Sequence, residues 1–303
     1  MSFFRSHAGF NITGDKIQIV EIDYKETDFY LENVDEEFYT EILDLSFSET
    51  KIINILQNTF NELILRKPLQ TDYVSFSFPN NYFKIFQLPV DSGITSSDLK
   101  DHLKWEVSVL YPDYDPDSFI TRYIENPNKT NEKTKDVVVF SAFKKYLKVI
   151  HKFCVRNNLI LKFVDNSHIA SNAFLMNKSI DNAVASIFLE EKLFSISFLK
   201  NKQLKYFKTS SINSVAEFPE KLDDEMIALS YLISENDISE LSISGNFISE
   251  NLLKKLNEIT GYQFNLINPF EKLKIASNLQ AEELITKRAH EFTASAGIAL
   301  RLA

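Results

Sequence analysis

Apolar and polar residues alternate with a period of two near the N-terminus, which is the pattern of half-buried strands. Residues 16–23 show it most clearly, because Ile17 and Ile19 alternate with polar neighbours. Strands are therefore expected over residues 10–13, 16–23 and 29–39, with Gly14 and Asp15 turning the chain between the first two.

Farther along the chain, apolar residues recur every three to four positions in some segments and form short continuous runs in others. Helices are expected over residues 50–66, 95–110, 144–157, 166–177, 216–233 and 249–259, and again from residue 281 to the C-terminus. Strands are expected over residues 73–78, 83–88, 119–124, 136–143, 160–164, 184–189, 194–199, 203–209, 241–244 and 263–267. Residues 126–135 are polar and aperiodic, which predicts an exposed loop.

Each half of the chain begins with consecutive strands and continues with alternating helices and strands, which predicts an α/β protein built from two related domains with mixed sheets. The first domain is expected over residues 1–180 and the second over residues 181–303. A helix-and-strand unit interrupts the first half, so an inserted subdomain is expected at about residues 90–135.

Composition narrows the function classes. Hydrophobic residues make up 44% of the 303 residues and charged residues 25%, which is typical of a soluble globular protein. The net charge of −9 argues against nucleic-acid binding. A lone cysteine, Cys154, excludes a disulfide framework, and the sequence lacks both a signal pattern and an apolar run long enough to insert in a membrane. The five histidines are dispersed, so neither a metal site nor a catalytic residue is expected.

Four segments carry short motifs, and their order along the chain matters for the comparison that follows. They are residues 9–21 (Gly-Phe-Asn-Ile-Thr-Gly-Asp-Lys and the strand after it), residues 99–112, residues 241–246 followed by an Asn-Pro-Phe at 268–270, and residues 296–301 (Ala-Gly-Ile-Ala-Leu-Arg). Together they resemble the PilM family of type IV pilus assembly proteins. That family belongs to the actin-like ATPase superfamily and is close in shape to the cell-division protein FtsA.

The resemblance implies an actin-like ATPase fold with a nucleotide cleft between the two domains. It also implies a groove on the first domain that takes a short cytoplasmic segment of a bitopic inner-membrane protein. The chain is then expected in the cytoplasm, peripheral to the inner membrane through that partner, and self-association is left open.

The resemblance also identifies the residues that would bind a nucleotide. On the first phosphate loop these are Asn11, Thr13, Gly14 and Lys16. Asn11 stands where the superfamily has a metal-organising carboxylate, and Thr13 stands where it has a glycine, so the segment also fits a plain strand and tight turn.

The other two loops of the resemblance are altered as well. Residues 184–198 should hold a second Asp-x-Gly phosphate loop but contain neither Asp nor Gly, and Glu190 and Glu191 are expected to form a solvated hairpin turn. On the adenosine side, Ser244, Gly245 and Asn246 keep one of two expected glycines.

A non-catalytic scaffold of a type IV pilus or type II secretion-like machine, with a degenerate nucleotide site and no cofactor, is therefore the expected function. An ATPase or kinase that binds ATP and magnesium stays open as an alternative. A filament-forming protein like FtsA is a further alternative, although that role usually needs a basic amphipathic helix after the C-terminus seen here, Leu302-Ala303.

Overall fold

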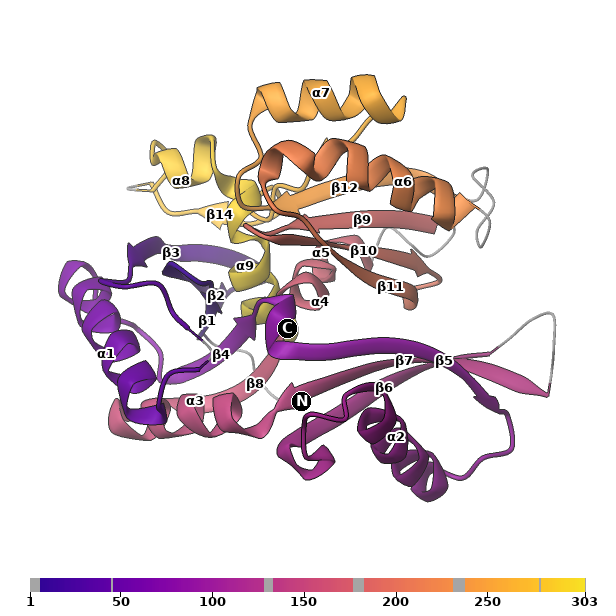
Figure 1. Cartoon of the computed structure of the whole chain (residues 1–303). Helices are drawn as coiled ribbons and strands as arrows, with labels where there is room; N and C mark the ends of the chain where they lie inside the picture. Colours follow the sequence, from indigo (N-terminus) through magenta and orange to yellow (C-terminus); the bar gives the residue numbers. More distant parts are fainter. Residues whose placement is uncertain are drawn as a thin grey trace.

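A computed structural model describes residues 6–44, 46–127, 133–176, 183–230, 238–277 and 279–302. The chain forms three sheets, two large and one small (Figure 1). Among the described residues, no helix is both long enough and apolar enough to cross a bilayer.

The first large sheet has the strand order β14-β3-β2-β1-β4-β8. Its strands are β1 (Ser6–Ile12), β2 (Lys16–Lys25), β3 (Asp28–Phe38), β4 (Tyr73–Phe78), β8 (Ile160–Asn166) and β14 (Lys274–Ile275). The first three strands form an antiparallel meander, and β4 and β8 extend it in parallel. Two helices, α1 (Glu49–Arg66) and α3 (Lys144–Arg156), pack their apolar residues on one face of this sheet.

The second large sheet repeats this topology, with the order β11-β10-β9-β12-β13. Its strands are β9 (Ala183–Leu189), β10 (Leu193–Lys200), β11 (Gln203–Ser211), β12 (Ile238–Gly245) and β13 (Asn265–Leu266). An antiparallel meander is again extended by parallel strands, and α6 (Phe218–Ser230) and α7 (Glu250–Thr260) cover the outer face. The prediction of two related α/β units with mixed sheets is confirmed.

The small sheet forms the inserted unit, in the order β5-β7-β6. It consists of β5 (Phe83–Asp91), β6 (Phe119–Pro127) and β7 (Thr134–Phe143), with α2 (Ser96–Leu110) on one face. This unit is wider than the expected residues 90–135. The ends of β6 and β7 also pair within the segment expected as a loop, since Pro127 faces Lys135, and residues 128–132 of that loop lie outside the described residues.

The structure differs from the expected elements mainly in the second half. The helix expected over residues 166–177 is broken into α4 (Ser167–Ser171) and α5 (Ala173–Met176). The C-terminal helical region consists of short pieces, α8 (Glu283–Thr286), a 3-10 turn at Ala289–Phe292 and α9 (Thr293–Ala299). The strand expected at residues 263–267 shrinks to β13, and part of the expected helix end, residues 231–233, lies outside the described residues.

The end of the chain returns to the first sheet. Strand β14 pairs with β3, and α9 packs on β1 and β2 on the face opposite α1. The range expected as the second domain therefore includes elements that pack with the first sheet, while the expected boundary at residues 180 and 181 lies outside the described residues.

Helices α4 and α9 lie against each other between the two large sheets, and small residues allow this contact. A Cβ built on Gly9 would lie 2.0 Å from the Ser295 carbonyl oxygen, and one on Gly297 would lie 2.0 Å from the Ala170 carbonyl oxygen. Because backbone atoms cannot yield that space, glycine is required at both positions. Beside this layer, Asn80, which follows β4, reaches Ser195 of β10.

Candidate nucleotide cleft

Asn11 lies one residue before the end of β1 with its side chain buried, and only 2% of the residue is exposed. Its amide nitrogen donates to Gln18 Oε1 at 3.0 Å. Its amide oxygen accepts hydrogen bonds from the hydroxyls of Ser77 at 2.9 Å and Ser167 at 2.8 Å. Both polar atoms are thus bound within the protein, so Asn11 holds three structural elements together and offers no free group to a metal-bound water.

The turn between β1 and β2 is closed by Thr13. Its hydroxyl oxygen accepts from the Lys16 backbone N–H at 3.0 Å and lies 2.7 Å from Asp15 Oδ1, to which it donates. Gly14 sits in this turn with an ordinary φ, and a Cβ there would meet nothing within 4 Å. The turn therefore does not depend on the conformational freedom of glycine at position 14.

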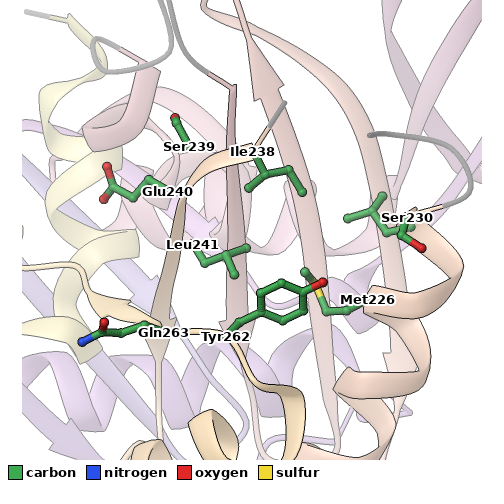
Figure 2. Close-up of a pocket in the computed structure, with 9 residues that line it drawn as sticks. Met226, Ser230, Ile238, Ser239, Glu240, Leu241, Tyr262 and Gln263 are labelled. Carbon is green, nitrogen blue, oxygen red and sulfur yellow. The ribbon is translucent and has the colours of Figure 1, made fainter. Parts of the chain in front are cut away.

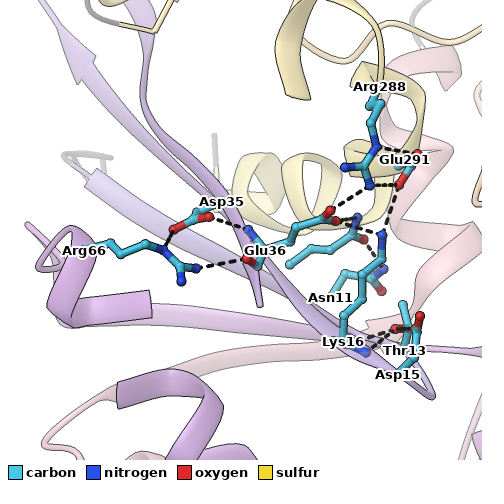
Figure 3. A network of polar contacts seen from close by, with 10 residues as sticks. Asn11, Thr13, Asp15, Lys16, Asp35, Glu36, Arg66, Arg288 and Glu291 are labelled. Carbon is cyan, nitrogen blue, oxygen red and sulfur yellow. Dashed lines mark hydrogen bonds and ion pairs between the residues drawn. The ribbon is translucent and has the colours of Figure 1, made fainter. Parts of the chain in front are cut away.

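Lys16 turns its ammonium away from the turn and into a buried charge network (Figure 3). Its Nζ lies 2.8 Å from Glu36 Oε2 on β3 and 3.0 Å from Glu291 Oε2 near the C-terminus. Arg288 completes the group, with its guanidinium 2.7 Å from Glu36 and 2.6 Å from Glu291. Two cations and two carboxylates neutralise one another, so the charge of Lys16 is already compensated.

Burial and the neighbouring cations act in opposite directions on the pKa of Glu291. Burial raises the pKa of Glu291, but hydrogen bonds and charge from Arg288 and Lys16 outweigh burial and leave the pKa below its ordinary value. A second, more exposed set of ion pairs lies on β3, the strand that carries Glu36. There Arg66, at the end of α1, bonds Asp35 and Glu37. These contacts fix β3 and the C-terminal segment around Lys16.

The second turn, between β9 and β10, contains Glu190, and the expectation that this side chain is solvated is wrong. Its carboxylate accepts from the Asn80 backbone N–H at 3.2 Å and from the Asn80 amide at 3.3 Å. Burial raises the pKa of Glu190 to about 7, although these bonds to Asn80 work in the opposite direction. Glu191, the next residue, is exposed as expected.

Glu190 and Asn80 belong to a set of polar residues, most of them fully buried, that joins the two large sheets. We call it the seam; its members are Asn80, Asn166, His168, Asn172, Ser186, Glu190, Ser195 and Ser197. Asn80 links first-sheet and second-sheet partners, since its amide nitrogen donates to Ser195 at 3.1 Å and its oxygen accepts from Asn166 at 2.9 Å.

His168 occupies the centre of the seam and is fully buried. Its Nδ1 lies 2.7 Å from the Ser195 hydroxyl and its Nε2 lies 2.6 Å from the Ser186 hydroxyl. Burial lowers the pKa of His168 to about 3, so the imidazole is neutral. The cap of α4 is supplied by Asn166, whose side chain accepts from the His168 and Ile169 backbone N–H groups.

The sequence carries a sign of buried polar contacts, and two of the residues that show it, Ser195 and Ser197, belong to the seam. Serine alternates with large apolar residues in β4 (Ser75, Ser77), β10 (Ser195, Ser197) and β12 (Ser242, Ser244), and all six serines are buried. Buried serines on a strand require hydrogen-bond partners, so this repeated pattern indicates a polar face in contact with another element.

The adenosine-side residues have structural partners too. Ser244 Oγ lies 3.0 Å from the Ser171 hydroxyl on α4. Gly245 has a φ of +108°, and a Cβ there would lie 2.2 Å from the Leu189 carbonyl oxygen, so glycine is required. The Asn246 backbone N–H donates to that same oxygen at 2.9 Å, while the buried Oδ1 of Asn246 has no hydrogen-bond partner among the described residues.

The predicted residues lie at strand ends of the two large sheets, and two pockets lie elsewhere. One, of about 170 Å³, lies between the end of α6, the start of β12 and Tyr262 (Figure 2). Its walls include Met226, Leu241 and Tyr262, and no lysine or arginine among the described residues. The other, of about 180 Å³, lies between α2 and β6 in the inserted unit. Neither is lined by any of the seven predicted nucleotide residues.

The described residues also contain no group of three or more His, Cys, Asp and Glu side chains arranged to hold a metal ion. The contacts that the structure shows at the two turns are hydrogen bonds and ion pairs between the protein's own groups.

No family model matches the sequence, and no curated protein matches it. Solved structures match the fold over almost the whole chain. A PilM-PilN type IV pilus biogenesis complex matches with a TM-score of 0.72 and 13% identity, covering 97% of this chain and 98% of the other. A protein of unknown function with an actin-like ATPase fold, from Bacteroides thetaiotaomicron, matches with a TM-score of 0.53, 12% identity and coverage of 97% and 95%.

The ethanolamine utilization protein EutJ from Carboxydothermus hydrogenoformans matches with a TM-score of 0.53, 8% identity and coverage of 98% and 89%. At such low identities these likenesses establish the fold alone. The chain has the actin-like ATPase fold, as its motifs indicated.

Proposed function

We propose that this chain is a non-catalytic scaffold of a pilus-type or secretion machine, which binds a cytoplasmic segment of a membrane protein. One observation carries the proposal: the two turns that would hold phosphates are occupied by the protein's own side chains. Asn11 is bound by Gln18, Ser77 and Ser167, and Lys16 is neutralised by Glu36 and Glu291. Phosphoryl transfer depends on positioning and on neutralising phosphate charge, and neither group is free to do so.

Similarity to a PilM-PilN complex over nearly the full length supports a partner-binding role. The surface of the inserted unit supports it independently. Five large apolar residues of this unit are exposed: Trp105, Val109, Leu110, Tyr114 and Ile120. Trp105 and Val109 are four residues apart on α2 and therefore share one face of that helix, and an exposed apolar face of this kind is typical of an interaction surface.

The experiment is co-purification from detergent-solubilised membranes of the source cells. One bitopic protein should be recovered, and a synthetic peptide of its cytoplasmic segment should compete it off. Trp105→Ser, which removes an exposed ring of the inserted unit, should weaken recovery, while Ile227→Ser on the second sheet's outer helix should not; the two residues are 58% and 52% exposed. Recovery of soluble proteins alone, or equal effects of the two substitutions, would overturn this placement of the partner.

ATP binding separates the scaffold from an enzyme of the same fold. A bound nucleotide must raise thermal stability by mass action, whereas a scaffold without a nucleotide site keeps its melting temperature. Restoring the superfamily residues with Asn11→Asp and Thr13→Gly should not create ATP binding, because Glu190 still lies in the second turn.

A further inference from the structure

The carboxylate of Glu190 is a partly buried anion that spans the seam. It comes from the β9–β10 turn of the second sheet, while its donor, Asn80, follows β4 of the first sheet. Both oxygens of the carboxylate lie within 3.4 Å of the Asn80 backbone nitrogen, and one also lies 3.3 Å from the Asn80 amide nitrogen. A single acidic side chain therefore connects the two halves of the fold.

The groups that contact the Glu190 carboxylate, directly or through Asn80, are neutral. On the first-sheet side it meets Asn80, and on β10 the nearest seam member is Ser195, which is bound to the neutral His168 of α4. On the β12 side the turn is held by the Asn246 N–H bonded to Leu189. Its chain neighbours Glu191 and Lys192 are exposed, and no ion pair links Glu190 to a described lysine or arginine.

We propose that the Glu190 carboxyl closes the seam in place of a bound ligand. Its protonated form closes the seam more tightly than its anion does. The proposal goes beyond the scaffold function, which does not require any response to pH. It rests on the contacts of the seam and holds whatever partner the inserted unit binds.

The direction of the response follows from burial. In the closed seam the pKa of Glu190 is about 7 because burial disfavours the charged form. Opening the seam hydrates the carboxylate and returns its pKa toward the ordinary value. Protonation therefore favours the closed seam, and this contribution is lost as pH rises through about 7.

Glu190→Gln imitates the protonated carboxyl, because the amide keeps an oxygen that accepts from Asn80 but carries no charge. Glu191→Gln is the matched control at the adjacent, exposed position. The full-length parent and both variants are melted at pH 5 and pH 8. Glu190→Gln should raise the melting temperature by several degrees at pH 8 and leave it unchanged at pH 5, while the Glu191→Gln control should follow the parent at both.

Comparing variants at one pH cancels the titration of His168, which is present in all three chains. Small-angle scattering should show the parent expanding from pH 5 to pH 8 and the Glu190→Gln chain staying compact. An equal difference in melting temperature between Glu190→Gln and the parent at both pH values would overturn the proposal. So would a carboxyl titration of Glu190 in the parent, followed by carbon NMR, with its midpoint at the ordinary value.

Discussion

The β1–β2 turn and the β9–β10 turn come from the two large sheets, and they neutralise buried charge in different ways. Lys16 in the first turn is matched by two carboxylates and one further cation, all close to its own sheet. Glu190 in the second turn has only neutral donors, and they belong to the other half of the fold. The first arrangement pairs each charge with an opposite charge, whereas in the second burial raises the pKa of the Glu190 carboxyl to about 7.

The proposed loss of a nucleotide site would follow a different route at each turn. At the first turn Lys16, a cation that could attract phosphate, is paired with Glu36 and Glu291. At the second, the acidic side chain of Glu190 bonds Asn80 of the other half. Both arrangements keep the two-sheet architecture.

The largest expected effect comes from the first turn. Lys16→Ala leaves Glu36 and Glu291 buried with Arg288 as their only cation among the described residues, and breaking a buried ion pair typically costs about 3–5 kcal/mol. Urea unfolding measures the change. Lys51→Ala is the control, because that lysine pairs with Glu41 at the exposed surface, where the loss should stay below about 1 kcal/mol. Similar losses of unfolding free energy in the two variants would show that the buried Lys16 network contributes no more to stability than an exposed ion pair.

A smaller effect is expected from the glycines beside the two turns. Gly245→Ala should destabilise the chain by about 2–3 kcal/mol, since its φ is positive and its Cβ would clash with Leu189. Gly14→Ala should change stability by less than about 0.5 kcal/mol, because space is open there and φ is ordinary. Chemical denaturation of both variants tests this, and a large loss at position 14 would mean that the first turn depends on glycine after all.

A third effect concerns acid. Burial lowers the folded pKa of His168 to about 3 from 6.5, so stability falls as pH drops through 6.5, by about 2 kcal/mol between pH 6.5 and pH 5. Glu190 titrates in the opposite sense, so the measurement uses a Glu190→Gln background. His168→Asn in that background should flatten the dependence on pH; an unchanged slope would place the titrating group elsewhere, for example at His7, whose pKa burial lowers to about 4.

The meanders, the main helices and the fold class could be predicted because they follow from local periodicity and capping. Thr95, for example, begins a segment expected to be a helix, and its side chain caps α2 by accepting from the Asp98 N–H. The two-residue strand β14 is too short to leave a periodic pattern, so its return to β3 was not predicted.

The contacts of the site were harder to predict because they join residues distant in sequence. Glu190 and its donor are 110 positions apart, and Lys16 and Glu291 are 275 apart. A local rule assigns a pair of glutamates at a turn to solvent, and that rule holds for Glu191 but not for Glu190. The repeated serines were the one local sign that a polar face lay buried between the sheets.

The proposed scaffold should bind no nucleotide, because the protein's own side chains occupy the two turns. A thermal-shift titration of the unmodified chain with ATP and magnesium, read beside a titration with magnesium alone, measures this. A ligand present at 100 times its dissociation constant would stabilise the fold by about 2.7 kcal/mol. The melting temperature should be the same at every ATP concentration. A saturable rise that requires ATP would overturn the proposed function.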